Sequence, residues 1–202
     1  FYYPHFQDDV IVKGSVVVGM SDSLVQNNGN MTIYENFTGQ GKFKSIAGMV
    51  TFKGDNYNFL EIANEFYNLV IDKSEFGAIA SMNYKIKIHN LEAKGGSFDV
   101  NGVIAKPDLD IDNELKIQDG ATVQALGYQM EVNVGGNYTN YNTSEFGGGF
   151  QNFGGFGLFV FNGTGNVDIC AGNTVFWGDT VRFENGGMYD LKSELNLNVS
   201  IL

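Results

Sequence analysis

Residues 48–54 are Gly-Met-Val-Thr-Phe-Lys-Gly, and residues 157–163 are Gly-Leu-Phe-Val-Phe-Asn-Gly. In both stretches a short run rich in β-branched and aromatic residues lies between two glycines. Such runs are typical of buried β-strands that are bounded by tight turns. The first stretch begins at position 48 and the second at position 157, an offset of 109. A similarity at a fixed offset predicts a repeat architecture.

The similarity extends in both directions from these stretches. Downstream, Phe66-Tyr67 matches Phe176-Trp177 at an offset of 110, and upstream, residues 31–38 match residues 132–139 at an offset of 101. Residues 1–202 are therefore predicted to form a single segment made of about two copies of one unit. The copies span roughly residues 10–109 and 110–202.

Short strands separated by turns are predicted along the whole chain. The chain has 27 Gly and 23 Asn but only 2 Pro, and Gly and Asn accept the positive φ angles of tight turns at little steric cost. Residues 60–68 fit a strand at least as well as a helix. The other predicted strands are 10–12, 16–18, 49–52, 69–71, 84–88, 115–117, 130–134, 158–161, 181–183 and 195–199.

The spacing of these strands favours a parallel β-solenoid. Hydrophobic residues make up 43% of the chain and aromatic residues 14%, which excludes a disordered chain and requires an interior. Strand and turn recur at short intervals along the chain, with no helical layer to cover a sheet, and this suits stacked coils that bury one another's apolar sides. The alternative is an antiparallel β-sandwich, with hairpins at the Asn-Gly turns.

The charge balance narrows the classes of partner. There are 12 Lys and Arg against 23 Asp and Glu, which gives a net charge of -11. A surface that follows nucleic-acid phosphates needs clustered basic residues, so nucleic acid is excluded, as is an anionic membrane surface. No apolar run is long enough to span a membrane. The single cysteine, Cys170, has no neighbouring base or cation and is predicted to be a small core residue.

The order of motifs resembles a repeat found in large secreted surface proteins of Bacteroidetes. In that repeat a Gly-Asn-Trp-Thr-Asn string precedes Val-Thr-Phe-Asn-Gly-Thr-Gly-Asn and then Phe-Asn-Leu-x-Ile. The second copy here has Gly136-Asn-Tyr-Thr-Asn140, then Phe159-Val-Phe-Asn-Gly-Thr-Gly-Asn166 and Ile169. The first copy has Val50-Thr-Phe-Lys-Gly54 and Phe66-Tyr-Asn-Leu-Val-Ile71. The resemblance runs from about Val10 to the last residues.

This resemblance implies an extracellular, cell-surface location. It implies export across the outer membrane by a type IX secretion system, and a structural or adhesive role in an adhesin, a stalk or a gliding protein. The implied partners are other parts of the same long chain, the secretion or outer-membrane machinery, and surface glycans. Because the chain ends within a strand-like run, we expect it to be a fragment of a longer polypeptide. Residues 176–179 depart from the pattern, since they lack its Asn-Leu.

Two tripeptides resemble the O-glycosylation sequence of Bacteroidetes. They are Asp22-Ser23-Leu24 and Asp179-Thr180-Val181. The resemblance implies that Ser23 and Thr180 carry glycans and therefore lie on the outside of the solenoid.

One acidic stretch, residues 108–114, is a candidate site. Strand alternation places Asp108, Asp110 and Asp112 on one side of the strand, with Leu109 and Ile111 on the other. Aligned carboxylates are ligands that Ca²⁺ prefers, which makes these three residues candidate calcium ligands, although the glycine-bearing loop of an EF-hand is missing. The alternative, which we favour, is a solvated edge whose charge blocks aggregation. No other cofactor is indicated.

Catalysis is the less favoured interpretation, and no catalytic residue is assigned. Paired carboxylates serve glycosidases, and polysaccharide lyases of β-helical fold need a Lys or Arg base beside the acids, for which Lys106 and Lys116 are candidates. The alternative to a structural or adhesive segment is therefore a β-helix protein that binds or cleaves polysaccharide.

Five aromatic residues are candidates for exposed contact with sugars or proteins, because Gly and Asn flank them and exposed rings offer flat apolar surface. The alternative, which we favour for the second cluster, is that residues 146–156 cap the solenoid. The five candidates are Tyr138, Tyr141, Phe146, Phe150 and Phe153.

Overall fold

The computed structural model describes residues 5–74, 77–81, 85–101, 108–126, 129–142, 149–152, 157–172, 175–193 and 196–201. Every regular element in these residues is a β-strand. Every pairing between strands is parallel. The predicted parallel β-solenoid is confirmed, and the antiparallel sandwich is wrong.

The strands follow one another without a helix in the described residues, and residues 60–68 belong to one of them. They are β1 (His5–Phe6), β2 (Val10–Val12), β3 (Val16–Val18), β4 (Ser23–Gln26), β5 (Met31–Ile33), β6 (Phe37–Ser45), β7 (Met49–Gly54), β8 (Tyr57–Lys73), β9 (Ala78–Ser81), β10 (Ile86–Gly95), β11 (Ser97–Val100), β12 (Leu109–Ile117), β13 (Thr122–Ala125), β14 (Glu131–Val134), β15 (Asn137–Asn140), β16 (Gly149–Asn152), β17 (Leu158–Phe161), β18 (Asn166–Cys170), β19 (Val175–Phe183), β20 (Met188–Leu191) and β21 (Asn196–Ile201).

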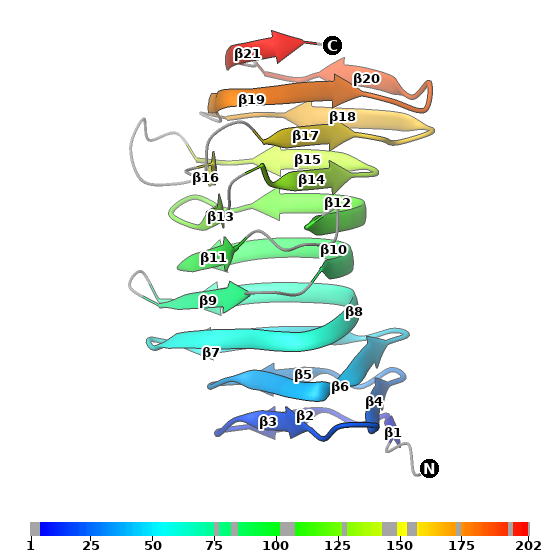
Figure 1. Ribbon diagram of the computed structural model, residues 1–202, viewed down its shortest axis with the longest axis vertical. Coiled ribbons are helices and arrows are strands. Elements are labelled where there is room, and N and C mark those ends of the chain that lie inside the picture. The colour runs from blue at the N-terminus through cyan, green and yellow to red at the C-terminus, as the bar shows by residue number, and fades with distance from the viewer. Residues whose placement is uncertain are drawn as a thin grey trace.

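The chain winds through three faces, and successive coils rise from the N-terminal to the C-terminal end (Figure 1). Face 1 contains β4, β6, β8, β10, β12, β14, β17 and β19. Face 2 contains β2, β5, β7, β8, β10, β12, β15, β18 and β20. Face 3 contains β3, β6, β8, β9, β11, β13 and β16. Long strands such as β8 bend over more than one face.

The register between coils shows that the coils use different lengths of chain. On face 2, Val50 pairs with Leu69, which pairs with Leu91, so the second of these coils is slightly longer than the first. The coil that leads from Tyr138 to its partner Ile169 is longer still. The predicted boundary near residue 109 does not interrupt the stack, because β12 pairs with β10 on one side and with β14 and β15 on the other. The repeated unit seen in the sequence therefore spans several coils.

The interior is filled by ladders of apolar side chains. On face 2, one side chain from each coil points inward at the same height of its strand, and none of the central seven is more than 3% exposed. Because each residue is covered by its neighbours above and below, the burial of apolar area stabilises the stack along its whole length. The seven residues are Met31, Val50, Leu69, Leu91, Leu115, Tyr138 and Ile169.

Glycine and asparagine occupy the turns, as their spacing predicts. Gly54 is the last residue of β7 and has a φ of 97°, and Gly120 lies between β12 and β13 with a φ of 79°. In the turn before β20, Asn185 and Gly186 have φ values of 61° and 66°. These angles favour residues that tolerate the left-handed region, so the turn chemistry agrees with the fold.

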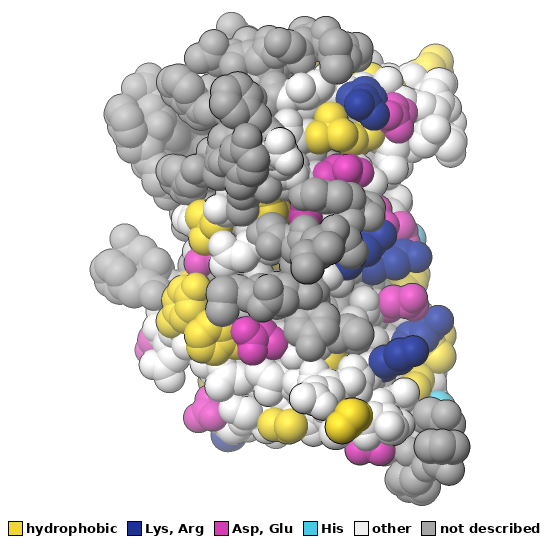
Figure 2. Space-filling view, in the orientation of Figure 1, with side chains coloured by type: hydrophobic (Ala, Val, Ile, Leu, Met, Phe, Trp, Pro, Cys, Tyr) yellow, Lys and Arg dark blue, Asp and Glu magenta, His cyan; other side chains and the backbone are white. Residues whose placement is uncertain are grey.

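Opposite charges face one another across neighbouring coils on the outer side. Lys44 Nζ lies 3.2 Å from Glu65 Oε2 on face 1, and Lys53 Nζ lies 2.9 Å from Asp72 Oδ2 on face 2. On the side shown in Figure 2, basic side chains gather toward one edge with acidic side chains between them. Exposed pairs of this kind contribute at most about 1 kcal/mol each. These ion pairs add little to the stability of the fold, but they favour the register in which opposite charges lie on adjacent coils.

Asp99 departs from this solvated pattern. It lies on β11, is 7% exposed, and accepts a hydrogen bond from the Ser97 hydroxyl. Burial raises the pKa of Asp99 above its ordinary value of 3.8, and the hydrogen bond from Ser97 offsets only part of this rise.

This raised pKa predicts a pH dependence of stability. The folded state binds the Asp99 proton more tightly than the unfolded state, so the stability contributed by this group is complete below pH 3.8 and is lost as the pH rises toward the folded pKa. Asp99→Asn stays neutral and is expected to unfold at higher denaturant concentration than the unchanged protein at pH 7. Chemical unfolding at pH 3.5 and pH 7 measures how far the denaturant midpoint of the variant exceeds that of the unchanged protein. This excess should be larger at pH 7, and a larger excess at pH 3.5 would contradict the prediction.

Candidate functional site

The predicted calcium ligands do not converge. Leu109 and Ile111 point inward as expected, but Asp108 is itself buried and accepts a hydrogen bond from the Glu131 backbone N–H at 2.8 Å. Asp110 Oδ2 lies 3.2 Å from Lys85 Nζ, and Asp112 is exposed. Among the described residues, no group of three His, Cys, Asp or Glu side chains could hold a metal ion. Asp108 and Asp110 instead each contact a residue of a different neighbouring coil, which corrects the calcium prediction.

The five aromatic residues predicted as exposed contacts differ in their burial. Tyr138 is fully buried because it belongs to the inner ladder of face 2. Phe150 is 4% exposed and packs against Phe159, with ring centroids 5.0 Å apart. Exposed contact is therefore wrong for both residues, although for Phe150 it is the less favoured alternative to a capping role. Strand alternation turns both rings inward. Tyr141 is 51% exposed, whereas Phe146 and Phe153 lie outside the described residues.

Three further predicted residues lie on the outer side of the coils. Ser23 and Thr180 are half-buried, and Ser23 lines a cavity of about 280 Å³ beside β3. Their glycosylation stays a prediction. Cys170 was expected in the core, but it follows the inward-pointing Ile169 and is therefore half-buried on the outer side. The alternation of the strand explains the difference.

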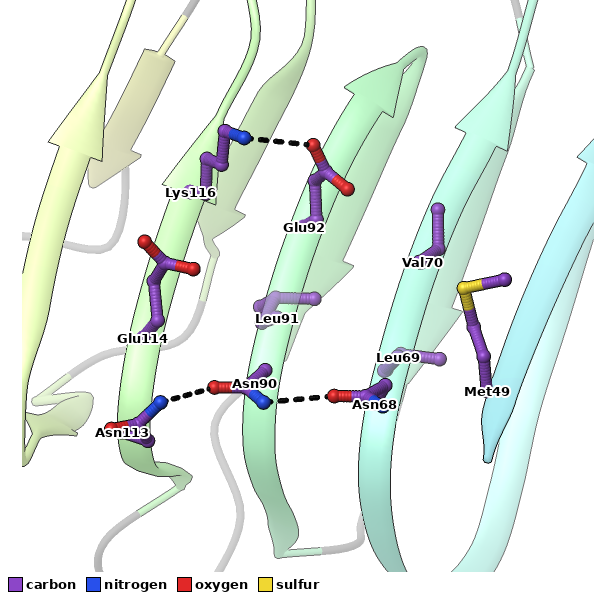
Figure 3. A pocket seen from close by; sticks show the side chains of 10 residues that line it. All are labelled: Met49, Asn68, Leu69, Val70, Asn90, Leu91, Glu92, Asn113, Glu114 and Lys116. Atoms are coloured by element: carbon purple, nitrogen blue, oxygen red, sulfur yellow. Dashed lines mark hydrogen bonds and ion pairs between the residues drawn. The ribbon is translucent and has the colours of Figure 1, made fainter. Parts of the chain in front are cut away.

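A groove on face 2 gathers polar side chains, of which the sequence singled out only Lys116 and the end of the acidic stretch at 108–114. It has a volume of about 290 Å³ and crosses β7, β8, β10 and β12. Because neighbouring strands are about 4.8 Å apart, it extends about 14 Å along the solenoid. Figure 3 shows the side chains that line it, which are Met49, Asn68, Leu69, Val70, Asn90, Leu91, Glu92, Asn113, Glu114 and Lys116.

One border of the groove is a ladder of three asparagines from successive coils. Asn68 Nδ2 donates to the Gly48 carbonyl at 3.0 Å, Asn90 Nδ2 donates to Asn68 Oδ1 at 2.8 Å, and Asn113 Nδ2 donates to Asn90 Oδ1 at 2.6 Å. All three bonds run in one direction along the stack, so each polarises the next. The exposed Oδ1 of Asn113 is the accepting end of this chain.

The opposite border carries charge. Glu92 Oε1 accepts a hydrogen bond from Gln118 Nε2 at 2.8 Å and lies 3.4 Å from Lys116 Nζ, while Lys94 Nζ lies 3.5 Å from Glu92 Oε2. Burial would raise the pKa of Glu92, but the Gln118 hydrogen bond and the two ammonium groups together hold this pKa below its ordinary value of 4.5. Glu92 is thus an ionised acceptor at neutral pH and is unsuited to act as a general acid.

The backbone explains why these groups meet. The register between β10 and β12 shifts after Ile88, so that Asn90 pairs with Glu114 and Asn113 is an extra residue in the strand. This bulge turns the Asn113 amide toward Asn90. A sequence signal exists in the recurrence of Asn-Leu at 68–69 and 90–91, but the bulged Asn113 interrupts it, because Glu114 separates Asn113 from Leu115.

The ladder itself is open to test. Asn90→Ala is expected to lower the free energy of unfolding by about 1 to 2 kcal/mol, because it leaves Asn68 Oδ1 and Asn113 Nδ2 without partners. Asn113→Ala removes only the exposed end of the ladder and should cost less than half as much. Urea unfolding of both variants, followed by circular dichroism, makes the comparison; equal losses would show that the ladder does not act as a chain.

The fold places the chain among parallel β-solenoid proteins. Comparison with protein-family models, with curated protein sequences and with solved structures finds no match. The described residues contain no helix with the length and apolar character needed to cross a membrane.

Proposed function

We propose that this chain is a rigid, non-catalytic segment of a large secreted cell-surface protein, exported by a type IX secretion system, with a structural or adhesive role. The observation that carries this proposal is the unbroken inner ladder of face 2, from Met31 to Ile169. A stack whose coils share one continuous apolar interior resists bending and suits a spacer. The resemblance to Bacteroidetes surface repeats supports the location.

The outer side chains also support a spacer. Three lysines each pair with a carboxylate on an adjacent coil, namely Lys44, Lys53 and Lys116. These ion pairs link one coil to the next, and they do not gather around a common reaction centre. A spacer needs a solvated, charged coat that discourages lateral aggregation, and the net charge of -11 provides one.

Surface exposure is the direct test of this proposal. Antibodies raised against the chain should label intact cells of the organism that makes it, and protease added to intact cells should remove the label. A cytosolic protein of the same cells serves as the control and should be labelled only after lysis. Labelling of this chain only after lysis would overturn the proposal.

Catalysis is tested separately with acidic polysaccharides as substrates. If the protein is a spacer, it is expected to leave these polysaccharides uncleaved, with no new polysaccharide ends released. Cleavage that is lost in Asp110→Ala would overturn the non-catalytic assignment, because Asp110 lies in the acidic stretch that a lyase or hydrolase of this fold would use.

The groove on face 2 favours a second candidate function, the binding of a neutral oligosaccharide. Asn113 Oδ1 and the half-buried Glu114 offer acceptors to sugar hydroxyls, and the asparagine amides offer donors. Met49 and Val70 offer apolar contact at the other end of the groove (Figure 3). The groove is close to the lower limit of volume for small-molecule sites, about 300 Å³, so it suits one end or one short stretch of a glycan.

Binding can be measured on an array of neutral oligosaccharides and then by calorimetry. Glu114→Gln combined with Asn113→Ala is expected to weaken binding at least about tenfold, the equivalent of one or two hydrogen bonds. Glu61→Gln, outside the groove, is the matched control and should bind like the unchanged protein. Equal affinity of all three proteins would exclude the groove as the binding site.

A further inference from the structure

Lys73 is buried, and none of the described residues forms an ion pair with it. It ends β8 at the corner between faces 2 and 3 and is only 4% exposed. Its Nζ donates to Asn58 Oδ1 at 2.5 Å and to the Lys53 carbonyl at 3.2 Å. No carboxylate among the described residues lies within salt-bridge distance of this amine. Lysine is almost never buried in this way unless it is paired with an opposite charge, so the arrangement requires a physical reason.

The environment shifts the amine toward its neutral form. Burial lowers the pKa of Lys73 from its ordinary value of 10.5, and the charge of Asp55 offsets only part of this effect. A desolvated lysine that loses its proton becomes a nucleophile. The nearest group is the carboxamide of Asn58, which is 5% exposed and equally shielded from water.

The geometry brings the amine close to an electrophilic carbon. Because a C=O bond is about 1.2 Å long, the contact of 2.5 Å between Nζ and Oδ1 places Asn58 Cγ at most about 3.7 Å from Nζ. Reacting atoms in near-attack arrangements are about 3 to 3.5 Å apart. A small rotation of either side chain would therefore align the two atoms, and both are held by parts of the same strand.

We propose that Lys73 and Asn58 join spontaneously in an intramolecular isopeptide bond. The neutral Nζ attacks Asn58 Cγ with its lone pair, and a tetrahedral intermediate forms. One proton passes from Nζ to the amide nitrogen of Asn58, the bond between Cγ and that nitrogen breaks, and ammonia leaves. The product is a secondary amide between the two side chains, and no oxidant, reductant or other reactant is needed.

Asp55 precedes Asn58 by three positions, in the turn between β7 and β8, and its charge acts on Lys73 without a direct ion pair. The bond would remove a buried amine from the interior and close β8, which crosses all three faces, into a covalent loop around one coil of the solenoid. Such a loop suits the rigid spacer, but the proposal does not depend on that function.

Mass spectrometry of the purified 202-residue chain decides the proposal. The intact protein, shown to be folded by circular dichroism, is expected to be lighter than its sequence by one ammonia. Trypsin does not cleave after an acylated lysine, so digestion should yield a peptide spanning positions 54–85 that contains the link. Lys73→Arg and Asn58→Ser should both have the full mass of their sequences.

Two outcomes would overturn the proposal. The first is a folded protein that keeps its full mass after prolonged incubation at mildly alkaline pH. The second is loss of ammonia with normal cleavage after Lys73, because an asparagine that cyclises to a succinimide loses the same mass but leaves the lysine free.

Discussion

Phe43→Ala is expected to lower the free energy of unfolding by about 3 to 5 kcal/mol. Phe43 is 2% exposed and packs on face 1 between Phe37 and Phe66, whose ring centroids lie 4.9 Å and 5.1 Å away. Removing the ring leaves a cavity bounded by the rigid backbones of the coils above and below, which cannot collapse into it without breaking their own strand pairing. The loss should therefore lie near the upper end of the range for core truncations.

Denaturant unfolding, followed by far-UV circular dichroism, measures this loss. Val17→Ala is the matched control, because Val17 also lies in a strand near the N-terminal end but is 71% exposed, and its truncation should change stability by no more than about 0.5 kcal/mol. Similar losses for the two variants would mean that Phe43 is not part of a packed interior.

Gly136→Ala is expected to cost about 3 kcal/mol or more, at the upper end for overpacking. A Cβ at this position would lie 1.8 Å from the backbone oxygen of Asn113 on the preceding coil. Backbone atoms cannot move aside as a flexible side chain can, so the two coils would have to separate locally. This close approach also explains why glycine precedes the asparagine in the Gly-Asn-Tyr-Thr stretch at 136–139.

Thermal unfolding compares this variant with Gly165→Ala. Gly165 lies in the turn before β18, and a Cβ there would meet no atom within 4 Å. The control should melt close to the unchanged protein, whereas Gly136→Ala should melt many degrees lower. If Gly136→Ala melted as the control does, the coils would not be packed as tightly as the structure indicates.

The features that follow from short-range pattern were predictable from sequence. The apolar runs at 50–52 and 158–161 identify buried strands, and the turns at Gly54, Gly120 and Asn185-Gly186 follow from residues that tolerate positive φ. The absence of a helical pattern excluded most other architectures. Alternation also placed Leu109 and Ile111 inward correctly.

The positions of single functional groups were less predictable. Tyr138 and Phe150 lie among Gly and Asn and were therefore candidates for exposed contact, but the strands they belong to turn both rings inward. The same limit applied to Asp108, whose carboxylate serves the backbone of the next coil instead of a cation. In each case the neighbour that decides the environment lies on another coil, a full turn of the solenoid away in the sequence.

Local pattern thus settles the strands, the turns and the repeated, stacked character of the chain, because each depends on residues within a few positions of one another. The register between coils determines which side chains meet, and it depends on coil lengths that vary and on the bulge at Asn113. A shift of one residue turns a side chain from the interior to the solvent. The asparagine ladder and the contact of Lys73 with Asn58 therefore emerge only once the coils are stacked.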